Sequence, residues 1–138
     1  MKTRILAAAT ALLAFVAVPC HAQASRFVGN WINVSPSGNL PRVQINSIPG
    51  GVTVHIWGKC TPTPCDWGTQ PGLLYSPNAA TNPLTGAVAV TSSFPQSFAR
   101  RTVVIRPLGT NQIEVEVYTE FTDHSGRHNY VDRNVLHR

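Results

Sequence analysis

The sequence predicts an all-β protein, an antiparallel eight-stranded up-and-down barrel, with a two-sheet β-sandwich as the alternative. Three observations support this fold class. After residue 24 no segment shows the roughly 3.6-residue periodicity of an amphipathic helix. Short runs of alternating apolar and polar residues recur instead, separated by clusters of Gly, Pro, Asn and Ser. The connections between these runs are mostly short, which favours pairing of consecutive strands, and closure of the sheet removes its exposed edges.

The start of the chain predicts an export signal. Lys2 and Arg4 supply a positively charged end, and Ile5–Val18 is an apolar run. This run is shorter than the roughly 20 apolar residues that a membrane-spanning helix requires, and no later run approaches that length. We therefore expect export to the periplasm or the medium, with no transmembrane segment in the mature chain.

Two small-residue patterns mark candidate cleavage sites, Cys20-His21-Ala22 and Ala22-Gln23-Ala24. We expect cleavage after Ala24, which makes residues 1–24 the signal peptide. The 138 residues less these 24 leave a single domain of 114, residues 25–138. A lipoprotein acylated at Cys20 is the alternative, but the preceding Ala17-Val18-Pro19 fits that signal poorly.

The charge balance argues against a nucleic-acid partner. Removal of Lys2 and Arg4 reduces the 11 basic residues to nine, against six acidic residues. The longest basic run in the mature chain is the pair Arg100-Arg101, so the positive charge is spread along the chain and forms no nucleic-acid footprint.

The first predicted strand places Phe27, Gly29, Trp31 and Asn33 on one face. Clusters of turn-forming residues separate it from the second and third strands, in which Val and Ile alternate with polar residues. The eight predicted strands are Phe27–Val34, Arg42–Ile48, Val52–Lys59, Thr69–Ser76, Ala87–Phe94, Arg101–Leu108, Gln112–Phe121 and Arg127–His137.

The later strands differ in how clearly they are patterned. Pro71-Gly72 weakens the fourth strand, and Pro95 separates the fifth from the sixth. The seventh has the clearest alternation, with Ile, Val, Val, Thr and Phe on one face. The opposite face, Glu114, Glu116, Tyr118 and Glu120, is typical of a solvated strand surface. A turn at residues 123–126 leads into the eighth strand.

Cys60 and Cys65 are predicted to form a structural disulfide. Export places them in an oxidising compartment, and they remain as an even pair once Cys20 leaves with the signal. Pro62 and Pro64 stiffen the loop between them. A redox pair usually has two intervening residues rather than four, and a zinc site would need two further ligands.

The aromatic residues around this loop form a candidate contact surface. Trp57, Trp67 and Tyr75 would supply a large contact area at a low cost in conformational entropy. The alternative is structural, because a small barrel needs plugs at its ends and a Trp packed on a disulfide would serve as one.

At Gly29-Asn30-Trp31 the first strand resembles the Gly-X-Trp opening of the calycins, the lipocalin and avidin superfamily of barrels. The resemblance implies that Trp31 closes one end of the core and that an Arg on the last strand packs across it. We expect Arg133 in that role, with Arg138 as the alternative. The avidin-like first strand also implies that Asn33 faces a ligand. The Trp-rich later strands of avidins are missing, so biotin binding is not expected.

The segment Trp57–Gly68 resembles a second group, small secreted or envelope proteins of bacteria with the pattern Trp-Gly-X-Cys-X-Pro-X-X-Cys-Asp-Trp-Gly. These proteins also carry an early Gly-X-Trp-X-Asn and a late Asp-X-Ser-Gly-Arg, which are found here in the same order. The group has no established activity. The resemblance therefore supports the architecture and leaves the function open.

Catalytic and metal-binding patterns are weak. No Ser lies in a Gly-X-Ser-X-Gly motif, and charged residues make up only 12% of the chain, too few for a dense polar active site. His55 with Cys60, Cys65 and Asp66 matches no metal-binding spacing, and His124 and His128 flank a turn that need not bring their rings together. We expect no metal and no cofactor.

These observations favour a non-enzymatic exported binding module. It would bind a small ligand in the barrel mouth or a protein partner at the Cys60–Cys65 loop. A second hypothesis is an inhibitor of a secreted or periplasmic hydrolase, with the rigid loop inserted into the cleft of the enzyme. A small hydrolase is the third, and it requires a His and a carboxylate next to a Ser in a concave site.

Overall fold

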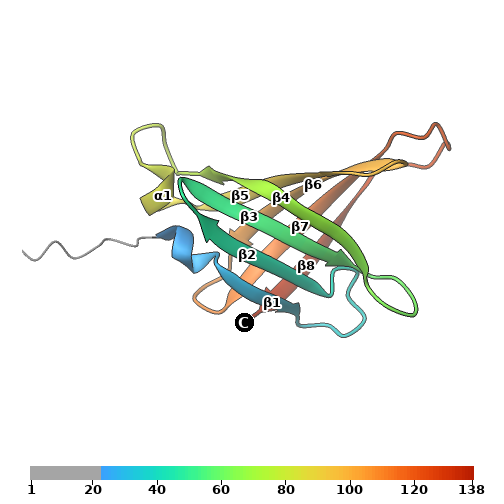
Figure 1. Cartoon of the computed structure of the whole chain (residues 1–138), viewed down its shortest axis with the longest axis horizontal. Coiled ribbons are helices and arrows are strands. Elements are labelled where there is room, and N and C mark those ends of the chain that lie inside the picture. Colours follow the sequence, from blue (N-terminus) through green and yellow to red (C-terminus); the bar gives the residue numbers. More distant parts are fainter. Residues whose placement is uncertain (1–22) are drawn as a thin grey trace, which may run out of the picture.

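The chain forms a closed antiparallel barrel in which eight strands follow one another in sequence order (Figure 1). The computed structural model describes residues 23–138. The strands are β1 (Gly29–Asn33), β2 (Arg42–Ile48), β3 (Gly51–Gly58), β4 (Cys65–Tyr75), β5 (Ala89–Pro95), β6 (Ala99–Pro107), β7 (Gln112–Phe121) and β8 (Tyr130–His137). The predicted barrel is thus confirmed, and the alternative of an open two-sheet sandwich is not what forms.

The export prediction rests mainly on residues 1–22, which lie outside the described part of the chain. Within residues 23–138, no helix combines the length and the apolar character that crossing a membrane would require. Two short helices were not predicted, the 3₁₀ helix η1 (Gln23–Arg26) and α1 (Pro83–Gly86). Each is four residues long, too short for a helical periodicity to show in the sequence.

Strand β4 is longer than predicted and begins at Cys65 itself. It pairs with β3 from Gly58↔Cys65 to Val52↔Gly72, so Pro71-Gly72 does not interrupt it. Pairing between β4 and β5 begins only at Leu73, and the Ser92 hydroxyl donates to the Pro71 carbonyl at 2.9 Å. A side-chain hydrogen bond therefore links β5 to β4 beside the proline.

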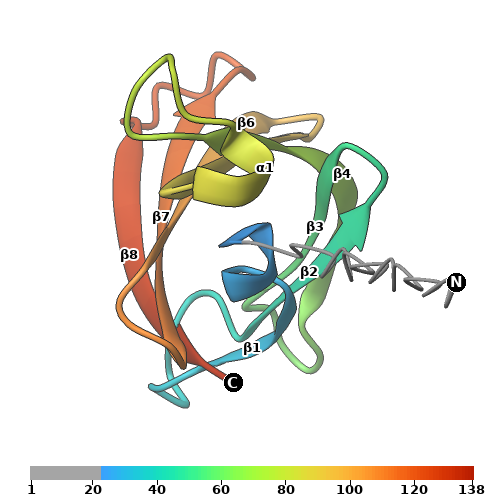
Figure 2. The same cartoon turned by 90° about the vertical axis from the view of Figure 1, so that its left-hand side faces the viewer.

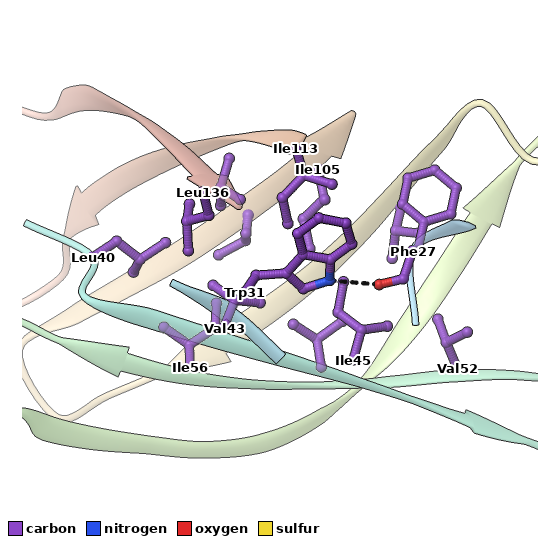
Figure 3. Packing of buried hydrophobic residues seen from close by; sticks show 14 of the residues in the cluster. Phe27, Trp31, Leu40, Val43, Ile45, Val52, Ile56, Ile105, Ile113 and Leu136 are labelled. Carbon is purple, nitrogen blue, oxygen red and sulfur yellow. Dashed lines mark hydrogen bonds between the residues drawn. The ribbon is translucent and has the colours of Figure 1, made fainter. Parts of the chain in front are cut away.

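The interior of the barrel is filled over most of its length by apolar side chains from every strand. Figure 3 shows how they surround Trp31, whose indole Nε1 donates to the Phe27 carbonyl at 2.7 Å. At one end η1 and α1 lie across the opening (Figure 2). The largest completely enclosed side chains are Trp31, Phe27, Phe94, Leu40, Ile45, Ile56, Ile105, Ile113, Leu136, Val43, Val52 and Val54.

Gly72 shows how tightly this interior is packed. A Cβ at this inward position would lie 2.7 Å from Val52 Cγ2 and 3.0 Å from Val90 Cγ1. Only a residue without a side chain fits between these two neighbours, because real carbon–carbon contacts are longer. The glycine that weakened the sequence pattern of β4 is therefore required by the core.

The barrel closes through a short contact between its first and last strands. Only Ile32↔His137 and Asn33↔Leu136 pair along the β1–β8 seam. The Val34 amide extends this pairing by donating to the Val135 carbonyl at 3.0 Å. Side chains strengthen the seam further, because Asn33 Nδ2 donates to Asn134 Oδ1 at 3.0 Å.

Arg138, and not Arg133, packs across Trp31. The Arg138 guanidinium carbon lies 4.6 Å from the centre of the Trp31 ring. Its Nη1 donates to the Val28 carbonyl at 2.6 Å and its Nη2 to the Thr110 carbonyl at 3.0 Å. These contacts tie the end of the chain to the residues just before β1 and to the β6–β7 turn.

The prediction for Arg133 was wrong because its apolar neighbours face outward. Val131 is 47% exposed, and the inward positions of β8 carry Asn134 and Leu136 instead. Arg133 Nε lies on the outer surface, 2.8 Å from Glu116 Oε1. Glu116 points outward, as predicted. Its carboxylate is nevertheless not solvated, because Arg106 covers it together with Arg133. The hydrogen bond from Arg106 lowers the pKa of Glu116.

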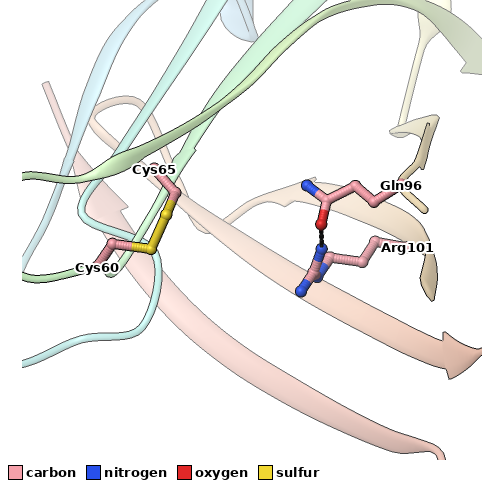
Figure 4. The surroundings of a disulfide bond; sticks show 4 residues. All are labelled: Cys60, Cys65, Gln96 and Arg101. Atoms are coloured by element: carbon pink, nitrogen blue, oxygen red, sulfur yellow. Dashed lines mark hydrogen bonds between the residues drawn. A yellow bond between two sulfur atoms is a disulfide. The ribbon is translucent and has the colours of Figure 1, made fainter. Parts of the chain in front are cut away.

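Cys60 and Cys65 form the predicted disulfide, with their Cα atoms 5.4 Å apart (Figure 4). The bond closes the β3–β4 loop, which projects from the end of the barrel opposite α1 (Figure 1). Residues 59–65 are all exposed. The Lys59 amide donates to the Asn39 carbonyl at 2.9 Å and its Nζ to the Ser37 carbonyl at 3.0 Å, which anchors the base of the loop.

Replacing both Cys60 and Cys65 with Ala is expected to lower the melting temperature by roughly 5–10 °C. Closing a loop of this size contributes about 2 kcal/mol through the entropy of the unfolded chain. Scanning calorimetry of the double variant measures the loss. A double variant with Thr61→Ala and Thr63→Ala in the same loop is the control and should melt within about 2 °C of the wild type. Equal melting temperatures for the cysteine variant and the wild type would contradict the stabilising role.

Arg138→Ala is expected to reduce the free energy of unfolding by about 1–2 kcal/mol, because it removes the contact with Trp31 and two charge-assisted hydrogen bonds at the seam. Arg100→Ala is the matched control, since Arg100 and its partner Glu120 are 56% and 50% exposed. The control should change this free energy by less than about 0.5 kcal/mol. Urea denaturation measures both, and losses of equal size would contradict the role assigned to Arg138.

Candidate functional site

A half-open cavity of about 500 Å³ occupies the mouth of the barrel, at the end opposite η1 and α1. It lies where β4, β6 and β8 begin, and the disulfide between Cys60 and Cys65 forms part of its wall. The rest of its wall comes from the loop before β2, the β5–β6 connection and the end of β7. The stapled loop and the cavity are therefore parts of one structure.

Aromatic and apolar side chains form much of the cavity wall. The Trp67 ring lies edge-on against Phe94, with ring centres 6.1 Å apart. Leu40 and Val117 are buried and close the cavity toward the core. Phe98 and Tyr130 line it as well, and they are 37% and 51% exposed. This combination of aromatic surfaces and partial exposure suits a planar or apolar group.

Gly58 allows Trp67 to lie in this position. A Cβ on Gly58 would be only 2.5 Å from Trp67 Nε1, so the indole packs directly on the glycine backbone at the end of β3. The glycine of the Trp57-Gly58 pair therefore has a packing reason, whereas Gly68 of the Trp67-Gly68 pair has a positive φ of 82° and an open space around it. Gly58 itself is buried beneath the ring.

Arg101 brings a positive charge into the cavity. It shares the inward phase of Val103 and Ile105 on β6. Its guanidinium carbon lies 4.5 Å from the centre of the Trp67 ring and 5.3 Å from that of Phe98. Its Nη1 donates to Gln96 Oε1, and Figure 4 shows these two side chains pointing toward one another across from the disulfide.

Thr119 lies beside Arg101 in the cavity wall. Its backbone is paired with Arg101 on β6 and with Tyr130 on β8, so the three residues form a row across three strands. The Thr119 side chain is 2% exposed, and its hydroxyl oxygen has no hydrogen-bond partner within residues 23–138. A buried polar atom in a native structure is nearly always hydrogen-bonded, so this hydroxyl is unusual.

The predicted ligand-binding residues are not gathered in one place, and Trp67 is the one that lines the cavity. Trp57 lies on the outer face of β3, where its ring stacks on that of His55 with the ring centres 3.9 Å apart. Arg42 covers the Trp57 ring, with its guanidinium carbon 3.4 Å from the ring centre. Tyr75 is 48% exposed at the far end of β4, where its hydroxyl accepts from Thr91 at 3.4 Å. Trp57 faces outward in the regular alternation of β3, whereas the register shift between β3 and β4 turns Trp67 inward.

Asn33 has a structural position instead of the expected ligand-facing one. It faces inward, as predicted, but does not line the cavity. Its Nδ2 donates to the Leu40 carbonyl at 2.9 Å and to Asn134 Oδ1 at 3.0 Å, and its Oδ1 accepts from the Ser35 amide at 2.8 Å. The amide is therefore committed to holding the β1–β2 loop, which in turn supplies Leu40 to the cavity.

His55 joins a carboxylate and a hydroxyl on the outer surface of the barrel. Its Nε2 lies 2.7 Å from Asp66 Oδ1, and its Nδ1 lies 2.7 Å from Thr69 Oγ1. The Gly68 amide, and after it His55, lowers the pKa of Asp66 by hydrogen bonding to its charged form. This arrangement resembles a charge relay, but it contains Thr instead of Ser, and His55 and Thr69 do not line the mouth cavity, which Asp66 alone of the three borders. Within residues 23–138, no cluster of His, Cys, Asp and Glu suitable for a metal ion is found.

The sequence reasoning did not single out Arg101 or Thr119, although a signal for both was present. Thr119 follows Ile113, Val115 and Val117 at the spacing of an inward face, and Arg101 precedes Val103 in the same way. Polar residues that continue an apolar face at the end of a strand mark the mouth of a barrel.

Gly58→Ala is expected to destabilise the protein by about 1–3 kcal/mol, because the added methyl group overlaps the Trp67 indole and forces the cavity wall to shift. Gly51→Ala on the same strand is the matched control, since a Cβ at Gly51 has no neighbour within 4 Å. Thermal denaturation followed by circular dichroism compares the two variants. If Gly58→Ala melts at the same temperature as Gly51→Ala, Trp67 is not held as described.

Comparison of this chain with protein-family models, with curated proteins and with solved structures finds no match. The function is therefore inferred from the geometry of the barrel itself.

Proposed function

We propose that this protein is an exported, non-enzymatic binding module that holds a small ligand in the mouth of its barrel. The observation that carries the proposal is the half-open cavity of about 500 Å³ at one end of an otherwise filled barrel. Its size and its mixed wall, in which Trp67, Phe98 and Tyr130 lie among polar and charged side chains, are compatible with a small-molecule site. A purely structural barrel would have no need to leave this end unfilled.

The cavity does not lie behind Asn33, which the resemblance to avidins implies would face a ligand. Trp31, Val43 and Leu136 fill that part of the interior completely. The unfilled volume lies at the open mouth instead, in front of Leu40 and Val117. A ligand here would keep one side in contact with solvent, so we propose a ligand that is only partly buried when it is bound.

Export is part of the proposal and is supported by the leader-like first residues and by the disulfide. Cleavage after Ala24 would divide the helix η1 (Gln23–Arg26). The Ala24 carbonyl accepts from the Phe27 amide at 3.1 Å, and Ala24 packs against the core. We therefore propose Ala22 as the cleavage site, in place of Ala24.

Membership of the calycin superfamily is likewise a proposal. The packing of the Arg138 guanidinium on Trp31 is the arrangement that the Gly-X-Trp resemblance implies.

The second candidate function is inhibition of a secreted or periplasmic hydrolase by the stapled loop. Residues 59–65 are exposed, closed by the disulfide and anchored at Lys59, so the loop would lose little entropy on entering a cleft. No comparable observation favours the hydrolase hypothesis, because Thr69 and His55 lie outside the mouth cavity.

Native mass spectrometry of the protein purified from the cells that produce it, followed by the denatured mass, is expected to show two results. Small extra mass should be present only in the native spectrum, because the ligand is held without a covalent bond. The denatured mass should correspond to a chain that begins at Gln23 and lacks two hydrogens for the disulfide. A bare native mass would contradict the ligand proposal, and extra mass the size of a whole protein would favour the inhibitor.

A further inference from the structure

Arg101 places a positive charge in the wall of the mouth cavity, and no carboxylate of the described chain pairs with it. Within residues 23–138 it forms no ion pair, and its hydrogen-bond partner is the uncharged side-chain oxygen of Gln96. Burial lowers the pKa of the guanidinium, because desolvation disfavours the charged form. The remaining N–H donors of this group face a space that a ligand can enter, and an anion there would offset the lost hydration.

The Thr119 hydroxyl supplies a second donor next to this cation. Paired residues on antiparallel strands hold their Cβ atoms about 4.5–5.5 Å apart, so Arg101 and Thr119 project side by side in the cavity wall. The hydroxyl is buried and has no partner of its own in the described chain. An unmade hydrogen bond of this kind is costly unless another molecule completes it.

The charges around the cavity select an anion of low charge. Lys59 and Arg101 contribute two positive charges to its lining, and Asp66 and Asp132 contribute two negative charges. Asp66 is engaged with His55 and the Gly68 amide on the outer face, and Asp132 Oδ2 accepts from Asn134 at 2.9 Å. A lining without net charge suits a monoanion better than a phosphate dianion, which the two carboxylates would repel.

The apolar part of the cavity selects the rest of the ligand. Trp67 and Phe98 lie on the guanidinium of Arg101, so a group bound to Arg101 would also contact aromatic surface. Tyr130 continues this surface on the other side of Thr119. A planar guanidinium binds a carboxylate through two parallel hydrogen bonds, and stacked aromatic residues favour a flat neighbour.

We propose that the mouth cavity binds a small organic carboxylate with a flat apolar body. Its carboxylate lies between the Arg101 guanidinium and the Thr119 hydroxyl, and its apolar body lies against Trp67, Phe98 and Tyr130. This inference rests on the proposed function, because it names the class of ligand for the same cavity.

Titration calorimetry with naphthoate on the full mature protein tests the proposal, with the uncharged naphthamide as the matched probe. Naphthoate is expected to bind at least about tenfold more tightly than naphthamide, because hydrogen bonds to a charged group are worth more than those to an amide. Inorganic phosphate is added as a competitor and should not displace naphthoate.

Arg101→Met is expected to weaken the binding of naphthoate by about 100-fold, since it removes the charge and the paired donors. Arg100→Met is the control, because Arg100 is the next residue on the same strand but points outward to Glu120. It should leave the affinity unchanged. Circular dichroism and the melting temperature verify that each variant is folded.

Thr119→Val should have effects of opposite sign on stability and on binding. Removing an unpartnered buried hydroxyl without changing the shape of the side chain should maintain or raise the melting temperature. The same change should weaken naphthoate binding by about tenfold, because a donor to the carboxylate is lost. Thr119→Ser retains the hydroxyl and should retain the affinity. A purely structural Thr119 would instead show lower stability and unchanged binding.

Two sets of results would overturn the inference. Three results would contradict the binding of a carboxylate while leaving a small-ligand site in place. They are equal binding of naphthoate and naphthamide, displacement of naphthoate by phosphate, and unchanged affinity in the Arg101→Met and Thr119→Val variants. Absence of binding for both probes would also overturn it. The native mass described above then decides separately whether the cavity carries a ligand of another class, so the two failures are distinguishable.

Discussion

Closure of the sheet across the β1–β8 seam is the constraint on which the rest of the structure depends. The seam has few backbone pairs, so side chains must complete it. Arg138 joins the end of the chain to the residues before β1, and Asn33 joins β1 to Asn134 on β8. The same Asn33 holds the loop that delivers Leu40 to the cavity. Failure at the seam would therefore disturb both the core around Trp31 and the wall of the mouth.

The two ends of the barrel differ because the inward positions change character along the strands. Near η1 they carry Trp31 and Ile113, which pack with Phe27 from the turn before β1, fill the space and exclude water. Toward the stapled loop the same faces carry Thr119 and Arg101. Large apolar residues can pack against one another, but a half-buried guanidinium needs neighbours that hydrogen-bond or solvate it. This end consequently stays open to solvent.

The alternation of side chains allowed much of the fold to be predicted, and the same rule explains where the prediction failed. Strands β2 and β7 have the predicted bounds because their patterns are strict and their flanking turns are clear. Arg133 was predicted to point inward because it shares its side of the strand with the apolar residues Val131 and Val135. These two residues lie on the outer face of β8, so the prediction failed. The position of Asn33 depends on Asn134, which lies 101 residues away in sequence, and local pattern cannot reveal such a contact. The cavity could not be predicted, since it depends on which inward residues of six segments meet at one end.

The β3–β4 loop has two sides, and each contacts a different space. Its inner side, through the disulfide, bounds the cavity, and its outer side is open to solvent. The Cys60–Cys65 bond therefore belongs to two surfaces at once, the wall of the cavity and the base of the exposed loop. Breaking that one bond would remove a constraint from both surfaces together.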